Sequence, residues 1–381
     1  MVNVACVTGN KIRVLMVLGN TGRGGAQAYA INVLKAIDHE RFQIDFAVNY
    51  CHPDGYDETI KQYGGNIHIV PEFKGINILA YLKSWNSILV NGKYDIVHGH
   101  VSSTAFIYLR LAKKNSCITI AHSHSAGYRG NRVIRMIKRL LTPGAKKFAD
   151  YLFSCSEPAA VRMFGKNYPN DPRHHFMPNA ILTDKYRFDY FIRHRIRNEL
   201  QLDDDTVLFG HVGTFSQPKN HQFVIDVFSE IKKMHCMNAK LILIGDGTLR
   251  QPIEIEVERR GLCDSVIFTG NVENVNEYMM AMDAFVFPSL FEGLPLTLLE
   301  AQASGLYCVV SDRITNQVFL NEFIVPLSIN LKANEWAEKL ITIPQCDRKL
   351  MYYSVRDTVF NMHQSISQLM SLYEEMKSMR T

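Results

Sequence analysis

The chain has 381 residues, 47% of them hydrophobic and 21% charged, and a formal net charge of +5. This length predicts two domains of roughly 150–200 residues each, and the composition excludes a disordered, collagen-like or low-complexity protein. Because no uninterrupted apolar run reaches ~18 residues, we expect no membrane-spanning helix.

Twelve short runs of mostly apolar, often β-branched residues recur along the chain, with helical stretches between most of them. The expected strands are Ile12–Leu18, Phe42–Asn49, Asn66–Val70, Asp95–His98, Cys117–His122, Tyr151–Cys155, Thr206–Val212, Lys240–Ile244, Val266–Thr269, Ala284–Pro288, Tyr307–Ser311 and Phe323–Val325. Buried parallel strands have this character, and their alternation with helices predicts doubly wound sheets. Two such sets favour an α/β protein with two Rossmann-like domains.

A turn signal at Met177–Ala180 follows the last strand of the first half. We place one domain at residues 1–185 and the second at 186–357, and we expect a helix over Tyr186–Glu199. The final segment, 358–381, carries an apolar stripe and predicts a helix that packs back on the first domain. The stripe is Ile366, Leu369, Met370, Tyr373 and Met376.

The distribution of charge and the cysteine spacing indicate binding partners and cellular location. Residues 1–200 carry a net charge of +13 and the remainder a net charge of −8. Either the first half binds an anionic surface, or solvated charges are unevenly distributed by chance. The eight cysteines lie singly, without metal-binding or disulfide spacing. With no signal-peptide pattern at the start, these features favour the reducing cytosol.

Three glycine turns follow predicted strands. They are Gly22–Gly25 with Arg23 inside it, Gly213-Thr214 followed by Lys219, and Gly245-Asp246-Gly247. Glycine lets a backbone approach a ligand closely, and ligands of open α/β sheets bind at the carboxyl ends of strands. The spacing matches neither a dinucleotide fingerprint nor a P-loop. A phosphate or nucleotide site is therefore expected, although a tight turn without a ligand has the same pattern.

A pair of glutamates follows the strand at Ala284–Pro288. Glu292 lies in a Pro/Gly loop at the ligand edge of the predicted sheet, and Glu300 lies inside the helix that starts near Pro295. Such carboxylates can accept hydrogen bonds from sugar hydroxyls, while the N-terminus of the helix faces a phosphate.

The segment EGLPLTLLEAQASG, with its E-x₇-E pair, resembles the donor-binding signature of the large retaining glycosyltransferase family 4, whose members have the GT-B fold. Other family motifs stand in the expected order, so the resemblance covers nearly the whole chain. They are Gly24-Gly25, Asp95–His98 with His100, Pro178-Asn179, Gly245–Gly247 and Pro288-Ser289. The chain is most similar to bacterial transferases that build capsular or exopolysaccharide repeat units.

The resemblance implies a GT-B fold, in which the two domains face across a cleft, and a role for each matching residue. Glu300 would bind the ribose, Glu292 the donor sugar, and Lys219 the diphosphate; His122 would lie near the reacting sugar. Backbone contacts with the donor would come from Gly24, Gly25, Gly213, Thr214, Gly245, Asp246, Gly247, Gly293, Leu294 and Leu296. Residues 1–185 would bind the acceptor and 186–357 the nucleotide sugar.

One position departs from the family pattern. Family members usually carry an arginine shortly before the lysine, where this chain has Thr214. Losing one charge-assisted phosphate contact weakens donor binding by ~1.5–3 kcal/mol, unless Arg250 or Arg23 compensates. The departure leaves open a catalytically weak or inactive partner subunit.

Two further patterns carry alternatives. His98-x-His100 and His122-x-His124 could chelate a metal, but without carboxylate or cysteine partners we expect packing or substrate contact, and no metal or other cofactor.

In Asn131–Leu141, basic residues lie opposite an apolar stripe, which is typical of a helix on an anionic lipid surface or of an ordinary amphipathic helix. The basic residues are Arg132, Arg135, Lys138 and Arg139. Nucleic-acid binding is not expected.

The sequence therefore predicts a cytoplasmic enzyme that is peripheral on the inner face of the plasma membrane. It would transfer a hexose or N-acetylhexosamine, with retention, from a nucleoside-diphosphate sugar to a glycan acceptor, expected to be lipid-linked. UDP-sugars are favoured and GDP-mannose stays open. The alternatives are the inactive partner subunit and a GT-B sugar-nucleotide epimerase, which would need further acid/base carboxylates.

Overall fold

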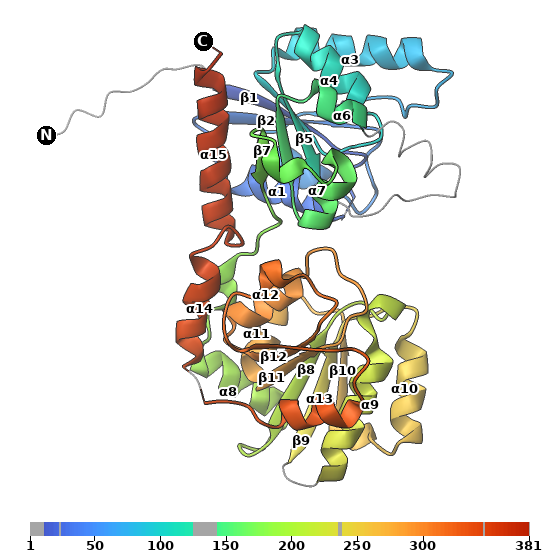
Figure 1. The fold of residues 1–381 in the computed structure, drawn as a ribbon, viewed down its shortest axis with the longest axis vertical. Helices are drawn as coiled ribbons and strands as arrows, with labels where there is room; N and C mark the ends of the chain where they lie inside the picture. The colour runs from blue at the N-terminus through green and yellow to red at the C-terminus, as the bar shows by residue number, and fades with distance from the viewer. Residues whose placement is uncertain (1–10, 23, 125–142, 235–237, 346, 381) are drawn as a thin grey trace, which may run out of the picture. The chain divides into compact units, whose positions relative to one another are not determined.

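The computed structural model describes residues 11–22, 24–124, 143–234, 238–345 and 347–380. They divide into two compact units: residues 1–179 with 363–381, and residues 180–362. Figure 1 shows the helices and strands of both units.

Unit 1 is built on a parallel sheet with strand order β3-β2-β1-β4-β5-β6-β7. Its strands are β1 (Ile12–Val17), β2 (Phe42–Val48), β3 (Ile67–Ile69), β4 (Ile96–Gly99), β5 (Ile118–Ser123), β6 (Tyr151–Ser154) and β7 (His174–Phe176). Its helices are α1 (Gly25–Ala36), α2 (Asp57–Gln62), α3 (Ile78–Gly92), α4 (Ala105–Lys114), α6 (Pro143–Phe148), α7 (Glu157–Phe164), η1 (Tyr168–Asn170) and the C-terminal α15 (Met362–Ser378). Trp85 of α3 and Tyr108 of α4 stack in its core, with ring centroids 5.1 Å apart.

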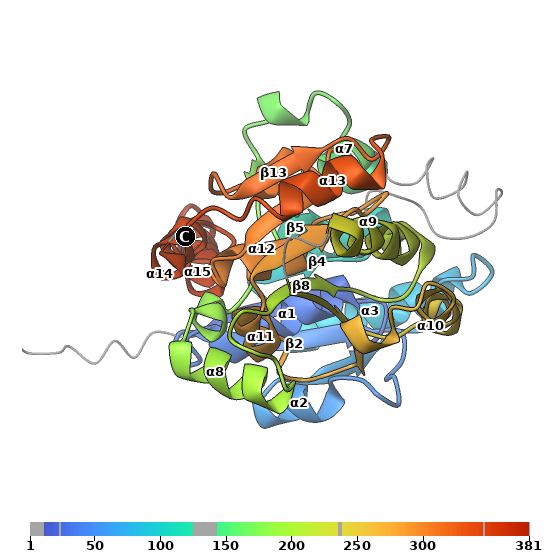
Figure 2. The same cartoon turned by 90° about the horizontal axis from the view of Figure 1, so that it is seen from below.

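Unit 2 has a second parallel sheet, ordered β10-β9-β8-β11-β12-β13. Its strands are β8 (Val207–Val212), β9 (Ala239–Ile244), β10 (Val266–Gly270), β11 (Ala284–Phe287), β12 (Tyr307–Ser311) and β13 (Ile324–Leu327). Its helices are η2 (Thr183–Tyr186), α8 (Tyr190–Glu199), η3 (Gln217–Lys219), α9 (His221–Met234), α10 (Arg250–Arg259), η4 (Cys263–Ser265), α11 (Val275–Ala281), α12 (Leu296–Ala303), η5 (Asn316–Val318), α13 (Ala333–Leu340) and α14 (Arg348–Arg356). Helix α9 packs against α10 and α13 (Figures 1 and 2). Helix α8 packs against α11, and helix α12 packs against α14.

All twelve predicted strands form, most of them within one or two residues of the expected ends. The strand that sequence analysis missed is β7, whose residues His174, His175 and Phe176 do not form an apolar run. It is an edge strand, and it forms because it pairs with the buried strand β6. The expected helix over Tyr186–Glu199 is shorter, since Asp189 caps α8 by accepting from the amides of Phe191 and Ile192.

The first domain boundary lies at 179/180 and not at the predicted 185/186, although it falls inside the predicted turn at Met177–Ala180. Ile181 forms a parallel bridge to Asn361, and η2 packs on α11, α12 and α14, so residues 180–186 belong to unit 2. The second boundary lies at 362/363 instead of 357/358.

The C-terminal helix α15 belongs to unit 1 and lies along the sheet beside α1 and β1 (Figure 1). Its predicted stripe is the buried face: Ile366, Leu369, Tyr373 and Met376 are each at most 3% exposed. The Tyr373 ring lies 6.1 Å from the Phe42 ring of β2. Through this packing, the C-terminal helix α15 contacts a strand near the start of the chain.

Candidate active site

The donor-site residues predicted for unit 2 gather at one edge of its sheet. Strands β8, β9 and β11 are neighbours and run parallel, so the loops that follow them meet at their carboxyl ends. The amide of Gly213 donates to the carbonyl of Ile244 at 2.9 Å, and that of Phe215 donates to Asp246 at 3.0 Å. The second and third glycine turns are therefore bonded to each other.

Gly245 is needed at this contact. Its φ is +132°, and a Cβ atom there would lie 2.2 Å from the carbonyl oxygen of Gly213. Gly213 in turn lies against the aliphatic part of Lys219, 3.1 Å from where its own Cβ would be. The lack of side chains at these two positions lets the loops close on each other and leaves room for Lys219.

Lys219 and Glu292, predicted separately, form an ion pair. The Lys219 Nζ lies 2.7 Å from Glu292 Oε1, and the two side chains are 19% and 12% exposed. Nζ also lies 5.1 Å from the centroid of the Phe287 ring, within the range of a cation–π contact. The loops are joined next to this pair, because Leu290 donates its amide to the carbonyl of Pro218 at 2.8 Å.

Glu300 lies on α12, whose N-cap is Pro295, as the sequence predicts. The phenol of Tyr186 hydrogen-bonds its carboxylate. Burial raises the pKa of Glu300 above its ordinary value, and the bond from Tyr186 partly offsets this rise. Burial and the charge of Glu300 raise the pKa of Tyr186, so the phenol stays a donor. Sequence reasoning missed Tyr186, since its partner lies more than a hundred residues away.

The remaining predicted contacts of unit 2 lie in the same loops. Thr214 is exposed after β8, and Gly293 and Leu294 precede α12, where the amide of Leu296 donates to the Leu294 carbonyl at 3.0 Å. Arg250, the possible substitute for the missing family arginine, begins α10 and lies 3.5 Å from Asp246. It therefore brings a guanidinium to the third glycine turn.

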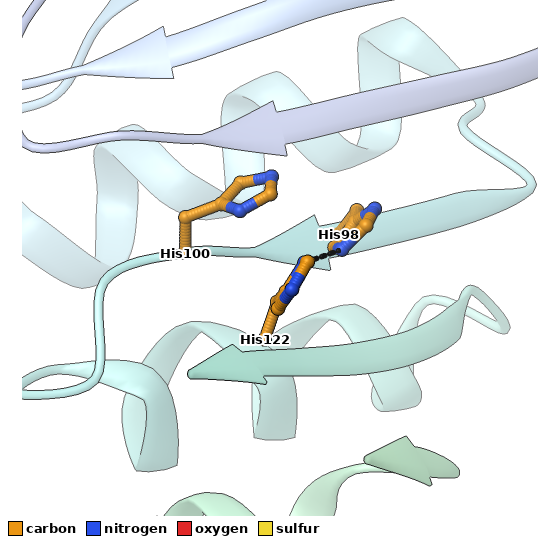
Figure 3. Close-up of side chains that lie close together, drawn as sticks. All are labelled: His98, His100 and His122. Carbon is orange, nitrogen blue, oxygen red and sulfur yellow. Dashed lines mark hydrogen bonds between the residues drawn. The ribbon is translucent and has the colours of Figure 1, made fainter. Parts of the chain in front are cut away.

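In unit 1, the first glycine turn and two pairs of histidines share the carboxyl edge of the sheet. Gly24 is the N-cap of α1, and Gly25 lies next to Asn179. Four histidines come from the ends of the neighbouring strands β4 and β5, on one face of the sheet, with Tyr29 of α1 packed over their rings at centroid distances of 4.9 to 6.4 Å. They are His98, His100, His122 and His124, the first three of which Figure 3 shows.

Three of these histidines are almost completely enclosed: His98 and His122 are 0% exposed and His100 is 9% exposed, while His124 is half-buried. Burial, together with the neighbouring imidazoles, lowers the pKa of each of the three, and burial lowers the pKa of His124 to about 3. All four rings are therefore neutral at neutral pH.

His122, predicted to lie near the reacting sugar, uses both ring nitrogens within unit 1. Its Nδ1 lies 3.1 Å from His98 Nε2, and its Nε2 lies 3.1 Å from the carbonyl oxygen of Met177. His98, His100 and His122 each offer a nitrogen within 4.8 Å of the others, which a metal ion could bridge, but the nitrogens His98 Nε2 and His122 Nδ1 hydrogen-bond each other.

The predicted basic helix, with Arg132, Arg135, Lys138 and Arg139, lies outside the described residues, as does Arg23. Within the described ranges, every helix is too short or too polar to cross a bilayer.

Comparison with known proteins identifies the family. Residues 23–185 match the model of "Glycosyltransferase Family 4", and residues 206–344 match that of "Glycosyl transferases group 1". The chain is 30% identical over 374 residues to the putative glycosyltransferase EpsF of Bacillus subtilis, with 95% of this chain and 96% of EpsF aligned. The protein is a family 4 glycosyltransferase.

Two further proteins are similar to this glycosyltransferase. It is 24% identical to the Escherichia coli UDP-Gal:α-D-GlcNAc-diphosphoundecaprenol α-1,3-galactosyltransferase, over 83% of this chain and 84% of that enzyme. Its structure resembles that of HepE of Anabaena in complex with UDP and glucose, with a TM-score of 0.70, 16% identity, and 94% and 99% of the two chains covered. The structural similarity confirms the predicted GT-B fold.

Proposed function

We propose that this glycosyltransferase transfers a hexose or N-acetylhexosamine from a UDP-sugar, with retention of the anomeric configuration, to a glycan carried on a lipid diphosphate in capsule or exopolysaccharide assembly. The observation that carries the proposal is the Lys219–Glu292 ion pair at the carboxyl edge of the unit 2 sheet, with Glu300 on the helix that follows the same loop. Its chemistry suits a sugar nucleotide, because it offers one cation for a diphosphate and two carboxylates for hydroxyls.

Each of these groups has a distinct task in the proposed reaction. Lys219 Nζ, together with backbone N–H groups at the start of α12, would stabilise the charge that develops on the leaving diphosphate. Glu292 would accept hydrogen bonds from the transferred sugar, and Glu300 from the ribose, with Tyr186 holding its carboxylate in place. The leaving phosphate would take the acceptor's proton on the same face, so no carboxylate needs to be a nucleophile and no metal is required.

The E. coli relative supports the choice of substrates. Its name specifies UDP-galactose as the donor, a diphosphoundecaprenol acceptor and an α-1,3 linkage. An acceptor of this kind lies at a membrane, which agrees with the predicted peripheral location on the inner face and with the charge of +13 in residues 1–200.

Calorimetric titration with UDP, GDP and ADP tests the donor site. We expect micromolar binding of UDP, and at least tenfold weaker binding in Glu300→Gln, since a charge-assisted hydrogen bond contributes ~1.5–3 kcal/mol. The matched control is Glu338→Gln on α13, an exposed glutamate whose loss should leave binding unchanged. Preference for GDP would redirect the proposal to a GDP-sugar donor, and equal binding by Glu300→Gln would refute the assignment.

Turnover tests the reaction itself. With a UDP-sugar and a synthetic GlcNAc-diphosphate lipid, we expect an α-linked product, which the anomeric proton coupling identifies. A β-linked product would refute retention. The inactive-partner alternative rests on Thr214, whose lack of a phosphate contact weakens donor binding, so the absence of nucleotide binding together with no turnover on a lipid-linked acceptor would favour it.

A further inference from the structure

A cavity of about 670 Å³ opens at the amino edge of the unit 1 sheet, opposite the edge that carries the first glycine turn and the histidines. Its walls come from the starts of β1, β2 and β4, from the segment before β3, from the end of α3 and from α15, so it lies within unit 1. Four of the lining side chains are cations and one is a carboxylate: Lys11, Arg13, Lys93 and Lys377, with Asp95.

Two contacts hold the guanidinium of Arg13 in the wall of this cavity. It lies over the Tyr94 ring, 5.4 Å from the centroid, and its Nη2 lies 3.3 Å from Asp45 Oδ2. Its Nε is buried and has no hydrogen-bond partner among the described residues. A buried donor without an acceptor is costly, so an oxygen atom of a ligand would gain by accepting from it.

The carboxylate beside Arg13 is satisfied mainly by neutral donors. Asp45 is 0% exposed and accepts from the Gln43 side chain at 3.1 Å and from the backbone and side-chain amides of Asn66 at 2.9 and 3.0 Å. The hydroxyl of Tyr94 donates to it at 2.9 Å. All four bonds are shorter than the 3.3 Å contact with Arg13, which therefore keeps donors for a second anion.

The cations of the cavity outnumber the carboxylates. Lys377 pairs with Asp95 at 3.2 Å and Arg13 with Asp45, whereas Lys11 and Lys93 are exposed and form no ion pair with a described carboxylate. The four cations against these two carboxylates leave an excess of two positive charges. A terminal phosphate group carries about −2 at neutral pH, so its charge matches this excess.

Helix ends account for only part of this charge. Lys93 is the C-cap residue of α3, and Lys377 lies in the last turn of α15, where cations offset the helix dipole without any ligand. Lys11 and Arg13 instead stand at the start of strand β1, which has no such dipole. Their charges therefore point to an anion in the cavity.

We propose that this cavity binds a terminal phosphate group, with Arg13 as its main anchor and Lys11 and Lys93 as supporting cations. The phosphate belongs either to a soluble compound or to the headgroup of a lipid, and the two sources share this chemistry. The site belongs to unit 1, whereas the proposed donor site belongs to unit 2, so it does not depend on the proposed function.

Two binding measurements on the full chain separate the two sources. Calorimetric titration with sodium phosphate at constant ionic strength tests a soluble phosphate. Flotation with phosphatidylcholine vesicles that contain phosphatidic acid tests a lipid headgroup, because this lipid ends in a phosphate monoester. Vesicles in which phosphatidylglycerol supplies the same surface charge are the control for general attraction to anionic lipid. Binding of sodium phosphate supports a soluble ligand, and binding of the phosphatidic acid vesicles alone supports a lipid.

Substitutions in the cavity locate the binding. We expect Arg13→Gln to weaken binding of the probe about tenfold or more, since it removes charge-assisted hydrogen bonds. Lys11→Gln combined with Lys93→Asn should weaken it about three- to tenfold, and asparagine tolerates the φ of +46° at position 93. Because Arg13 also contacts the buried Asp45, thermal unfolding checks that its variant folds. The lysine variant changes two exposed positions and tests the same cavity if it does not.

Two control variants complete the test. Lys74→Gln removes an exposed charge of unit 1 outside the cavity and should leave binding unchanged. Lys219→Met removes the cation of the proposed donor site and should also leave it unchanged. The proposal would be refuted by a wild-type chain that binds neither probe, by binding that the cavity variants do not weaken, by equal weakening in Lys74→Gln, or by a loss confined to Lys219→Met. Failure of sugar transfer would affect only the proposed function.

Discussion

At the scale of single residues, the proposed donor site centres on a contact between two opposite charges. Lys219 and Glu292 are largely enclosed and 2.7 Å apart, so the ammonium that should meet a diphosphate is already paired with a carboxylate. In the proposed function, a diphosphate would therefore compete with Glu292 for Lys219. Glu292 would then be released from the ion pair and could accept a hydrogen bond from a sugar hydroxyl.

This arrangement predicts opposite effects of two substitutions on UDP binding. Lys219→Met should weaken UDP binding about tenfold or more, since it removes a charge-assisted contact. Glu292→Gln should leave UDP affinity unchanged or raise it, because it removes the competitor, while transfer falls by about a hundredfold. Calorimetry with UDP and a transfer assay measure the two effects. Equal weakening of UDP binding by both variants would contradict the competition.

At the scale of elements, the site depends on loops that follow parallel strands and bond to one another. The β8 and β9 loops touch through Gly213 and Gly245, and the β11 loop is joined to η3 through Leu290. Because each loop begins where a buried strand ends, the sheet fixes its starting point. The side chains of the proposed donor site then need only short loop segments to reach their positions.

Gly245 tests this dependence. Gly245→Ala should lower the free energy of unfolding by about 2 kcal/mol and weaken UDP binding, because a Cβ at φ +132° would overlap the Gly213 carbonyl. Urea denaturation measures the first effect. Gly293→Ala in the β11 loop is the control, since a Cβ there has no described atom within 4 Å and should leave stability nearly unchanged. Similar stability of both variants would exclude close loop contact.

At the scale of the whole molecule, both units enclose neutral histidines. In unit 2, burial and the charge of Lys219 lower the pKa of His221 from 6.5 to about 4, and burial lowers the pKa of His211 as well. In unit 1, His98, His100 and His122 have lowered pKa values for the same main reason. Such groups take up a proton only when the chain unfolds, over the pH range between their two pKa values.

Stability should therefore decrease as the pH falls below about 6.5. At pH 5 an unfolded His221 is protonated and a folded one is mostly not, so this residue alone should lower the free energy of unfolding by about 2 kcal/mol relative to pH 7 or above. Calorimetric unfolding at pH 7 and pH 5 measures the loss. His221→Gln should reduce it, and His194→Gln on the surface of α8 should not. An unchanged Tm at pH 5 would contradict the buried neutral state.

The sequence alone determined the elements and their order along the chain. Runs such as Tyr307–Ser311 are read correctly because a strand buried on both faces must be apolar throughout. Strand β7 was missed because His174, His175 and Phe176 owe their conformation to the neighbouring strand. The glycine turns and the Glu292 and Glu300 pair were also recognised, since each depends on local conformation and on a short spacing.

Only the tertiary structure decided which of these residues meet. Lys219 and Glu292 are 73 residues apart, and Tyr373 and His98 are 275 apart, so no local pattern links them. The same holds for Tyr186 beside Glu300, and for the hydrogen bonds that join His122 to His98 and to the carbonyl of Met177. Periodicity and propensity act over a few residues, whereas side-chain contacts depend on how sheets and helices pack, and that packing decides which groups can reach a substrate.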